Sequence, residues 1–533
     1  MENSSLPGTF FQDCFGSLYW VLPLIVVLYS VADAFITRNV VRGQPKYPLV
    51  GSRVAFTPRF VLNLIFFSKA VHLLQYGYKR FKNSAFQLIR NDGRIVILPL
   101  SLLDELSALP ATVANPQAAL EKDLMGQYTG LNLILENRLH HTIVQRRLTP
   151  RLPLLIPGME KAVTDAFEEH IPQCEEWTES MPYQALGRIS ARVAADAIVG
   201  PAFCNDKTWL DVAFNYTENL FRTVVILRAL PGWVCPLVFP LLPSYWKGQW
   251  YLRTAKQLLG PKLRELIKQS DAGVWEPKDN SADDLNILSW LASTAKGRDR
   301  DPDSISHVLV LVALASVHTT LLRMVNVVYD IVAAGPVLRD KLLDEIASVA
   351  DDGWASGAYD ELQCLDSVLC ESQRLSPPTT LGMKRIFRSS YTFRDGTHVP
   401  AGTYVCMPIH AIENDAAHTA HPEDYDGLRS FRARGELRPS GDENADKLAA
   451  KEFQFSTPTR TALNFGYGKT ACPGRFFASV VIKMVLVKLL TDYEFRFLPG
   501  TGRPKNLMVH EFLFPWPWQR MLVRRRKEGS CPF

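Results

Sequence analysis

The long segments of this sequence repeat their apolar residues at helical spacing, and this periodicity limits the possible folds more than any other feature. Four segments share the pattern: 303–334, 336–350, 360–375 and 474–490. Strand signals are short by comparison, and they lie at 93–100, 391–409 and 493–499. We therefore predict one mainly α-helical soluble domain with small β-sheets at its edge.

The composition allows a deep core and argues against several classes of protein. Of the 533 residues, 47% are hydrophobic and 21% are charged, which is ordinary for a large globular chain. The net charge is +5, but no basic stripe with interleaved aromatic residues is present, so nucleic acid is not expected as a partner. Nine cysteines without a CxxC pair indicate thiols in a reducing compartment rather than a disulfide framework or a zinc site.

An apolar segment near the N-terminus, FGSLYWVLPLIVVLYSVADAFI at 15–36, is long enough to cross a bilayer as a helix. Arg38, Arg42 and Lys46 follow it, and no Lys or Arg precedes it, so the positive-inside rule places the soluble part on the cytoplasmic side. The missing basic region before the segment argues against a cleaved signal peptide. We predict a membrane anchor here, with a buried core helix as the alternative.

These signals divide the chain into three parts. Residues 1–42 form the predicted anchor, with its helix at about 15–36. Residues 43–51, GQPKYPLVG, form a linker that two prolines stiffen. Residues 52–533 form the soluble domain.

A single cysteine lies between a glycine-rich turn and an amphipathic helix, in NFGYGKTACPGRFFASVVIK at 464–483. Gly466 and Gly468 permit turn conformations that let backbone amides point toward Cys472. Cys472 would lie at the start of a helix, where free N–H groups favour an anion. Gly474 leaves space for a flat cofactor. The segment suits a thiolate that ligates a metal, and a buried structural cysteine is the alternative.

The spacing in this segment resembles the haem-thiolate loop of the cytochrome P-450 family, F-x-x-G-x-[RH]-x-C-x-G-x-x-x-A. The matching residues are Phe465, Gly468, Cys472, Gly474 and Ala478. One position departs from the pattern. Thr470 stands where the family has an Arg or His that reaches a haem propionate, so the resemblance implies that this contact is weaker here or supplied elsewhere.

Further motifs resemble the same family in the same order along the chain. In ESQRLSP, Glu371 and Arg374 are three residues apart on one helix face, where they can pair. The segment HPEDYDGLRSFR resembles the family's segment whose arginine, here Arg429, joins that pair in a buried network behind the haem. A surface salt bridge is the alternative for the pair. Arg385 follows at the position of a propionate-binding arginine, and the alternative for it is a solvated strand edge.

The segment LHHTIVQRRLTPRL at 139–152 resembles a helix in which a WxxxR pattern supplies another propionate partner. His141 would stand in the tryptophan position, and Arg146 or a neighbour would be the base. The spacing between these two residues is one longer than in the family pattern.

The segment LVALASVHTTLLRMV at 311–325 resembles the helix that carries A-G-x-[DE]-T. Ser316 takes the place of the glycine, His318 replaces the acid, and Thr319 is retained as the residue that would hold dioxygen and relay protons. Either the imidazole joins the proton relay or water carries the proton. The alternative is a core helix whose hydroxyl groups bond to carbonyls one turn earlier. A histidine here also resembles fungal members that act in secondary metabolism.

The segment 221–246 is apolar and contains four prolines. It resembles the family's region over the substrate entrance that dips toward the membrane, with an ordinary core segment as the alternative.

Taken together, the resemblance covers nearly the whole chain after the anchor and implies the cytochrome P-450 fold with haem b as cofactor. Cys472 would be the axial ligand of the haem iron, and thiolate ligation favours O–O cleavage. No flavin or nicotinamide domain is evident, so electrons would come from NADPH through a separate reductase at the same membrane. The resemblance implies a monooxygenase acting on a hydrophobic small molecule, most plausibly a terpenoid or a polyketide-derived metabolite. The expected location is the endoplasmic reticulum membrane, single-pass, with the catalytic domain cytoplasmic.

Two other functions remain open at this point. A haem-thiolate isomerase or dehydratase would rearrange an oxygenated substrate without external electrons, although it would not need Thr319. A membrane-tethered haem carrier or sensor would bind the cofactor without turnover. A third reading, a membrane-anchored helical interaction protein without haem, would require all of these motifs to be coincidental.

Overall fold

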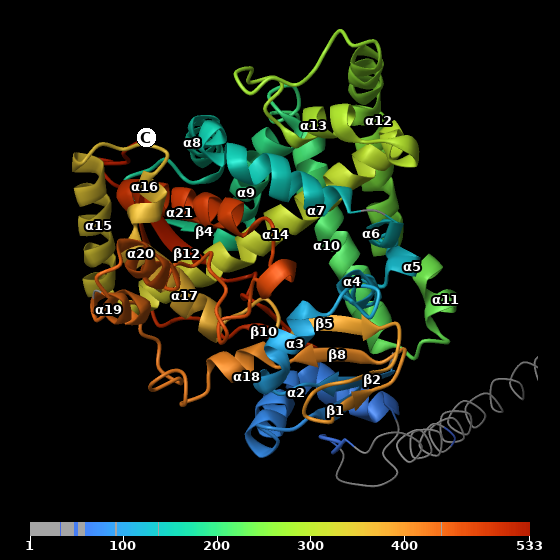
Figure 1. Ribbon diagram of the computed structural model, residues 1–533. Coiled ribbons are helices and arrows are strands. Elements are labelled where there is room, and N and C mark those ends of the chain that lie inside the picture. Colours follow the sequence, from blue (N-terminus) through green and yellow to red (C-terminus); the bar gives the residue numbers. More distant parts are fainter. Residues whose placement is uncertain (1–31, 33–46, 52–58, 91–92, 137, 439) are drawn as a thin grey trace, which may run out of the picture.

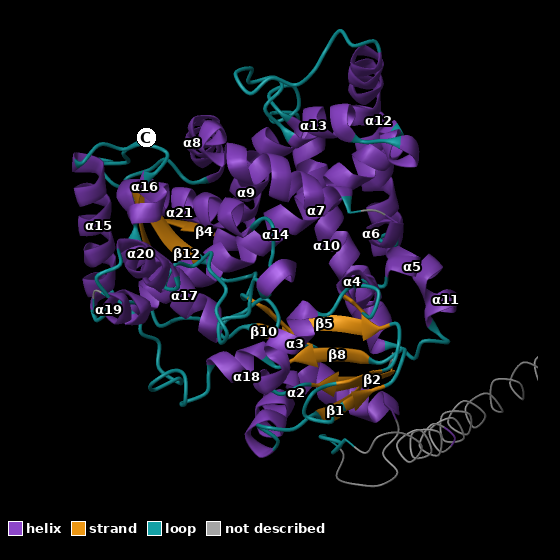
Figure 2. Cartoon of the chain, viewed as in Figure 1, coloured by secondary structure: helices purple, strands orange, loops and turns teal. Residues whose placement is uncertain are grey.

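The computed structural model describes residues 32, 47–51, 59–90, 93–136, 138–438 and 440–533. Apart from residue 32, the predicted anchor helix at about 15–36 lies outside the described residues, and so do residues 43–46 of the linker. Helices dominate the described part, and the strands gather in small sheets (Figures 1 and 2). The predicted mainly α-helical class is therefore confirmed.

The helices of the first half of the chain run over the following ranges. They are α2 (Arg59–Arg80), α3 (Leu103–Ala108), α4 (Pro116–Asp123), α5 (Gly126–Thr129), α6 (Leu133–Glu136), α7 (Leu139–Ile143), α8 (Thr149–His170), α9 (Pro182–Val199), α10 (Lys207–Ala229), α11 (Cys235–Val238) and α12 (Pro243–Asp271). Those of the second half are α13 (Ile287–Thr294), α14 (Pro302–Ala334), α15 (Pro336–Asp351), α16 (Ala358–Glu361), α17 (Gln363–Leu375), α18 (Ile409–Glu413), α19 (Arg429–Gly435), α20 (Glu443–Lys451) and α21 (Arg475–Asp492).

Helix α14 is the centre of the helical part. It begins at a cap in which the Asp301 side chain accepts a hydrogen bond from the Ser304 amide, with Pro302 in the first turn, and it ends before Gly335 at φ +90°. It packs against α9, α10, α12, α17 and α21. Among the described residues, it is also the helix whose length and hydropathy would allow a membrane span, but 78% of its apolar window is buried inside the molecule. In this fold α14 is a core helix.

The strands form separate small sheets. The strands are β1 (Phe86–Arg90), β2 (Gly93–Ile97), β3 (Ala114–Asn115), β4 (Thr178–Ser180), β5 (Gly382–Phe387), β6 (Tyr391–Thr392), β7 (His398–Val399), β8 (Tyr404–Met407), β9 (Tyr493–Phe497), β10 (Leu507–Val509), β11 (Phe512–Phe514) and β12 (Met521–Arg525). Strands β4 and β12 lie among the helices, and β1, β2, β5 and β8 lie at the lower edge of the view in Figure 1. The largest sheet has the order β1-β2-β8-β5-β3, with β2 and β8 parallel and the other neighbours antiparallel. Pairing of Arg385 with Val405 fixes the position of the Arg385 side chain.

The predicted elements agree with the structure where the periodicity is strong. The segments 303–334, 336–350 and 474–490 correspond to α14, α15 and α21. The predicted helix at 360–375 is instead broken at Leu362, whose ψ of 74° is not helical, so α16 and α17 are separate. Several strands lie outside the predicted strand segments: β1, β3, β4, β5, β10, β11 and β12. Four of them, β3, β4, β10 and β11, have at most three residues, which is too few to show a periodic pattern.

Candidate active site

The loop that carries Cys472, residues 464–474, is called the cysteine loop here. Gly466 has φ +78°, and a Cβ at this position would lie 3.0 Å from the Thr470 carbonyl oxygen. Gly468 has φ +58°, so both glycines adopt the left-handed conformation that other residues avoid. The Cys472 amide donates a 2.7 Å hydrogen bond to the Phe465 carbonyl and closes the loop.

The sulfur of Cys472 lies at the start of α21. The backbone amides of Gly474 and Arg475 lie beside this sulfur, and the Arg475 Nη1 donates to the Cys472 carbonyl at 2.9 Å. Burial raises the pKa of the Cys472 thiol, while the two amides and the Arg475 charge lower it. The expected amides from the glycine turn are not the donors at the sulfur, because the turn directs its hydrogen bonds to the backbone. The helix start supplies the donors instead.

Gly474 has an ordinary φ of −89°, and a Cβ added at this position would have Val144 Cγ1 as its nearest heavy atom, at 3.8 Å. Neither the backbone nor a described neighbour therefore requires glycine at this position. Space for a flat cofactor beside Gly474 stays a prediction.

Arg385 extends from β5 to the cysteine loop. Its Nη2 donates to Thr470 Oγ1 at 2.8 Å, and its Nη1 donates to the Lys384 carbonyl. The side chain is buried, and burial lowers the pKa of Arg385 to about 10. No carboxylate of the described residues lies within ion-pair distance of its guanidinium group. A buried cation without an anionic partner is costly, so this site fits an anionic group such as a propionate.

Helix α14 presents two exposed side chains in an otherwise buried stretch. Between Ile305 and Ile331, Ala315 and Thr319 are exposed, and every other side chain is buried or half-buried. Residues four apart lie on the same helix face, so Ala315 and Thr319 share one face. The Thr319 hydroxyl donates to the Ala315 carbonyl at 2.7 Å, which leaves its oxygen free to accept.

Ser316, three residues before Thr319, lies half-buried beside this face, and His318 does not share it. The Ser316 hydroxyl donates to the Val312 carbonyl at 2.9 Å, which is the back-bonding expected of a core helix. His318 is buried and stacks on Phe214 of α10, with ring centroids 5.2 Å apart. Neither ring nitrogen has a hydrogen-bond partner among the described residues, and burial lowers the pKa of His318 to about 3. A neutral imidazole on a different face from Thr319 is poorly placed for the predicted proton relay.

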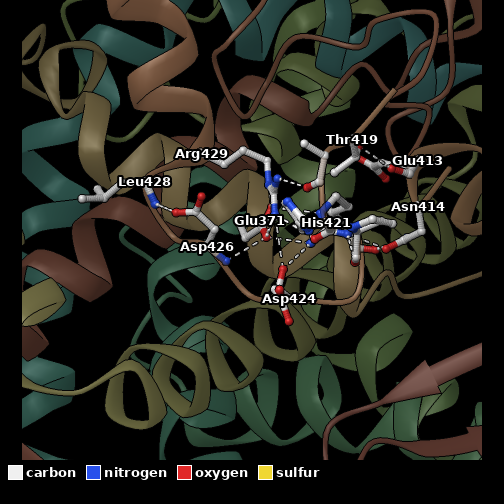
Figure 3. A network of polar contacts seen from close by, with 12 residues as sticks. Glu371, Glu413, Asn414, Thr419, His421, Asp424, Asp426, Leu428 and Arg429 are labelled. Atoms are coloured by element: carbon white, nitrogen blue, oxygen red, sulfur yellow. Dashed lines mark hydrogen bonds and ion pairs between the residues drawn. The ribbon is translucent and has the colours of Figure 1, made fainter. Parts of the chain in front are cut away.

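Glu371, Arg374 and Arg429 meet in a largely buried network (Figure 3). Arg374 donates to both oxygens of Glu371, at 2.9 Å from Nε and 2.6 Å from Nη2. Arg429 from the start of α19 donates to the same carboxylate at 3.2 Å. The side chains of Glu371 and Arg374 are 2% and 4% exposed, so this is not a surface salt bridge.

The segment with His141 and Arg146 contains a π-helical turn at Val144–Leu148. A π turn places residues five apart on one side of a helix, where an α-helix places residues four apart. The spacing of His141 and Arg146 exceeds the WxxxR pattern by one residue, and the π turn accounts for this extra residue. Neither side chain is fully buried: His141 is half-buried and Arg146 is exposed.

Several features of the site fit haem: the sulfur with two amides beside it, the buried Arg385 and the exposed face of α14. Sequence reasoning missed Arg475, which holds the Cys472 carbonyl, and Asn464, which binds Glu413 at 2.7 Å. A basic residue three positions after the cysteine was a signal for the first contact. No sequence signal links Asn464 with Glu413.

Comparison with known proteins agrees with this geometry. The family model described as Cytochrome P-450 matches residues 106–521. The chain is 36% identical to the cytochrome P-450 monooxygenase olcJ of Penicillium canescens, over 91% of this chain and 89% of olcJ. It is 34% identical to an ent-kaurene oxidase of Gibberella intermedia, over 99% and 98% of the two chains.

The chain is also 32% identical to the cytochrome P-450 monooxygenase paxP of Penicillium paxilli, over 98% of both chains. Among solved structures, the retinoic acid-bound cyanobacterial CYP120A1 superposes with a TM-score of 0.58 at 19% identity. That alignment covers 85% of this chain and 94% of the cyanobacterial chain, and it supports the fold alone.

Proposed function

The chain belongs to the cytochrome P-450 family and is a haem-thiolate monooxygenase, and on this premise we propose that Cys472 is the axial ligand of haem b. The observation that carries the proposal is the pair of amides, from Gly474 and Arg475, at the Cys472 sulfur. These donors stabilise a thiolate without closing the side from which iron would bind. Haem held by this thiolate would supply the activation of dioxygen with electrons from a separate donor, which is the chemistry of a monooxygenase.

Arg385 would hold one propionate, because it is a buried cation that lacks a carboxylate partner among the described residues. Thr470 would assist by orienting Arg385 through the 2.8 Å hydrogen bond to Nη2. The propionate contact that the family makes at the Thr470 position is thus replaced by an indirect one. Arg146 on the π turn, with His141 of α7 five residues before it, would hold the second propionate.

Thr319 would serve as the hydroxyl of the oxygen site, since it is on the exposed face of α14 with Ala315 beside it. Its hydroxyl donates a hydrogen bond to the Ala315 carbonyl, so Oγ1 can still accept a hydrogen bond from a proton donor. Rotation of the hydroxyl would then let it donate its own proton to another acceptor. Because His318 is buried and neutral, water rather than the imidazole would bring the proton to Thr319. Ser316 would have a structural role.

Electrons would come from NADPH through a separate reductase at the membrane. The substrate would be a hydrophobic small molecule, and a relative named for the oxidation of ent-kaurene supports a terpenoid. A polyketide-derived metabolite fits the same apolar chemistry. The number and position of the oxidations are set by parts of the substrate site that these motifs do not define.

A membrane location is proposed for two reasons. The apolar segment at 15–36 would anchor the chain in the endoplasmic reticulum membrane, with the catalytic domain on the cytoplasmic side. The second reason is an apolar rim of four exposed side chains: Trp233, Leu237, Leu241 and Trp246. Exposed groups of large apolar residues are typical of membrane or partner contact.

The proposal is tested by the carbon monoxide difference spectrum of the reduced full-length protein. The wild type should show a Soret band shifted far to the red, and Cys472→Ser should lose that shift. Cys204→Ser, which changes a half-buried thiol elsewhere, is the matched control and should keep the band. A well-folded wild type without haem absorbance would refute the role of Cys472.

Turnover separates this function from the alternatives. Oxygen consumption that depends on a reductase and NADPH is expected of a monooxygenase. A haem carrier would show the Soret band without such consumption, and an isomerase or dehydratase would convert substrate without either reagent.

A further inference from the structure

The last residue of α18, Glu413, is joined to the cysteine loop. The Asn464 Nδ2 donates a 2.7 Å hydrogen bond to Glu413 Oε2. Asn464 directly precedes Phe465, whose carbonyl accepts the hydrogen bond from the Cys472 amide. A movement of Asn464 would therefore reach the backbone that holds Cys472.

The next residue, Asn414, connects the same short segment to the ion network (Figure 3). Arg374 Nη1 donates to Asn414 Oδ1 at 2.5 Å, and Asn414 Nδ2 donates back to the Arg374 carbonyl at 3.0 Å. Two consecutive residues, 413 and 414, thus link the network of Glu371, Arg374 and Arg429 to the cysteine loop. The network is largely buried and hydrogen-bonded, so it offers a support for the loop.

The pair between Glu413 and Asn464 is incomplete when Glu413 is ionised. Asn464 Oδ1 is buried and has no hydrogen-bond partner within the described part of the chain, while a carboxylate offers only acceptors. A protonated carboxyl group adds the O–H donor that Oδ1 lacks. A buried amide oxygen without a donor costs the free energy of its desolvation, and protonation of Glu413 offers Oδ1 a donor that would remove this cost.

The surroundings of Glu413 favour its protonated form near neutral pH. Burial raises the pKa of Glu413 to about 7, although the hydrogen bond from the Asn464 amide and the charges of Arg374 on α17 and Arg323 on α14 oppose this shift. Glu371 on α17 adds a like charge that raises the pKa further. Two other titratable groups lie nearby, and both are uncharged: burial raises the pKa of the Cys370 thiol and lowers the pKa of His410 to about 4.

We propose that Glu413 is a positioning residue for the cysteine loop: its protonated carboxyl group satisfies both polar atoms of the Asn464 amide, and ionisation breaks half of that pair. This inference rests on the proposed haem-ligating role of Cys472. The loop is held most firmly below neutral pH, and it loosens as the pH rises and Glu413 loses its proton.

The test compares the full-length wild type with Glu413→Gln and Glu413→Ala at pH 6 and pH 8. Between these values the protonated fraction of a group with a pKa near 7 falls about tenfold. In the wild type, the fraction of red-shifted Soret band in the reduced carbon monoxide spectrum should fall with this change. Glu413→Gln keeps a donor and an acceptor for Asn464 at every pH, so its fraction should stay high and flat.

Glu413→Ala should show a low fraction at both pH values, because it removes the partner altogether. Hydrogen exchange of residues 464–472 gives a second readout, in which each variant is compared with the wild type at the same pH. Protection in the wild type should match that of Glu413→Gln at pH 6 and fall below it at pH 8.

A wild-type fraction that does not change with pH, or a Glu413→Gln variant that follows the wild-type pH dependence, would overturn this inference. A wild type without the red-shifted band at either pH would instead refute the ligand role of Cys472. The two failures are therefore distinguishable.

Discussion

Adjacent residues on α14 have opposite environments. Thr319 is exposed on the face that it shares with Ala315, whereas His318 is 5% exposed and lies against Phe214. A step of one residue rotates a side chain by about 100° around a helix, which explains the difference. The motif A-G-x-[DE]-T places residues in sequence order, but the helix face decides which of them can reach a bound substrate.

The burial of His318 gives a prediction for the pH dependence of stability. Burial lowers the pKa of His318 to about 3 in the folded protein, against about 6.5 in the unfolded chain. The unfolded state then binds more protons below pH 6.5, so the stabilisation is complete above pH 6.5 and is lost as the pH falls. Between pH 6.5 and 5.5 this residue should lower the free energy of unfolding by about 1 kcal/mol.

Urea unfolding of the wild type and of His318→Phe measures this contribution. The variant keeps an aromatic ring beside Phe214 but cannot titrate, so it should lose less stability over the same pH interval. Other buried histidines contribute equally to both proteins and cancel in the comparison. Equal losses in the two proteins would show that His318 is not buried in a neutral form.

At the scale of elements, the apolar pattern of the segment at 221–246 does not determine whether its side chains are buried in the core or exposed. It comprises the end of α10, the short helix α11, a 3-10 turn at Phe239–Leu241 and the start of α12. Prolines divide it into these pieces, because proline has no amide hydrogen for a continuing helix. The side chains of the apolar rim belong to this segment and are exposed, whereas an ordinary core segment would bury them.

Contact of the apolar rim with lipid predicts a specific change in fluorescence. Trp233 is 61% exposed on the rim, and Trp518, between β11 and β12, is 64% exposed and is not part of the rim. When the full-length protein is bound to vesicles that contain brominated phospholipid, the bromine should quench Trp233. Trp233→Phe should therefore reduce the quenched fraction, and Trp518→Phe should leave it unchanged. Equal effects of the two substitutions would contradict the membrane-facing role of the rim.

The break between α16 and α17 shows the limit of periodicity. The residues from 360 to 375 keep helical spacing, yet the backbone turns at Leu362, whose side chain is fully buried. Glu345 of α15 accepts hydrogen bonds from the amides of Cys364 and Leu365, so it caps the start of α17. A cap from a distant helix cannot be read from the local sequence.

At the scale of the whole molecule, Glu371 joins segments that are far apart in the sequence. It lies on α17, binds Arg429 at the start of α19, and accepts a hydrogen bond from the Asp426 amide at 2.9 Å. The adjoining segment, residues 413 and 414, extends the connection to the cysteine loop. The network of Glu371, Arg374 and Arg429 therefore supports the cysteine loop without being part of that loop.

Removing the negative charge of Glu371 should destabilise the whole molecule. Glu371→Gln would leave Arg374 buried without its carboxylate, and breaking a buried ion pair in this way costs about 3–5 kcal/mol. Glu443→Gln is the matched control, because Glu443 pairs with Lys447 on the surface, where the loss should stay below about 0.5 kcal/mol. Thermal unfolding and retained haem absorbance measure both variants. A Glu371→Gln protein as stable as the control would contradict the structural role of the network.

The sequence by itself determined the features that depend on neighbours along the chain. These are the long helices, the turn and helix start around Cys472, and the pairing of Glu371 with Arg374, since each involves residues within a few positions of one another. The order of the motifs was enough to indicate the family and its cofactor.

Only the tertiary structure decided which distant residues meet. The hydrogen bond from Arg385 to Thr470, the contact of Glu413 with Asn464 and the stacking of His318 on Phe214 each join separate elements. Periodicity states which face of an element is apolar, but it does not state which element covers that face or in what register. Packing of the whole chain sets those contacts, and so it also sets which polar groups remain free for a ligand.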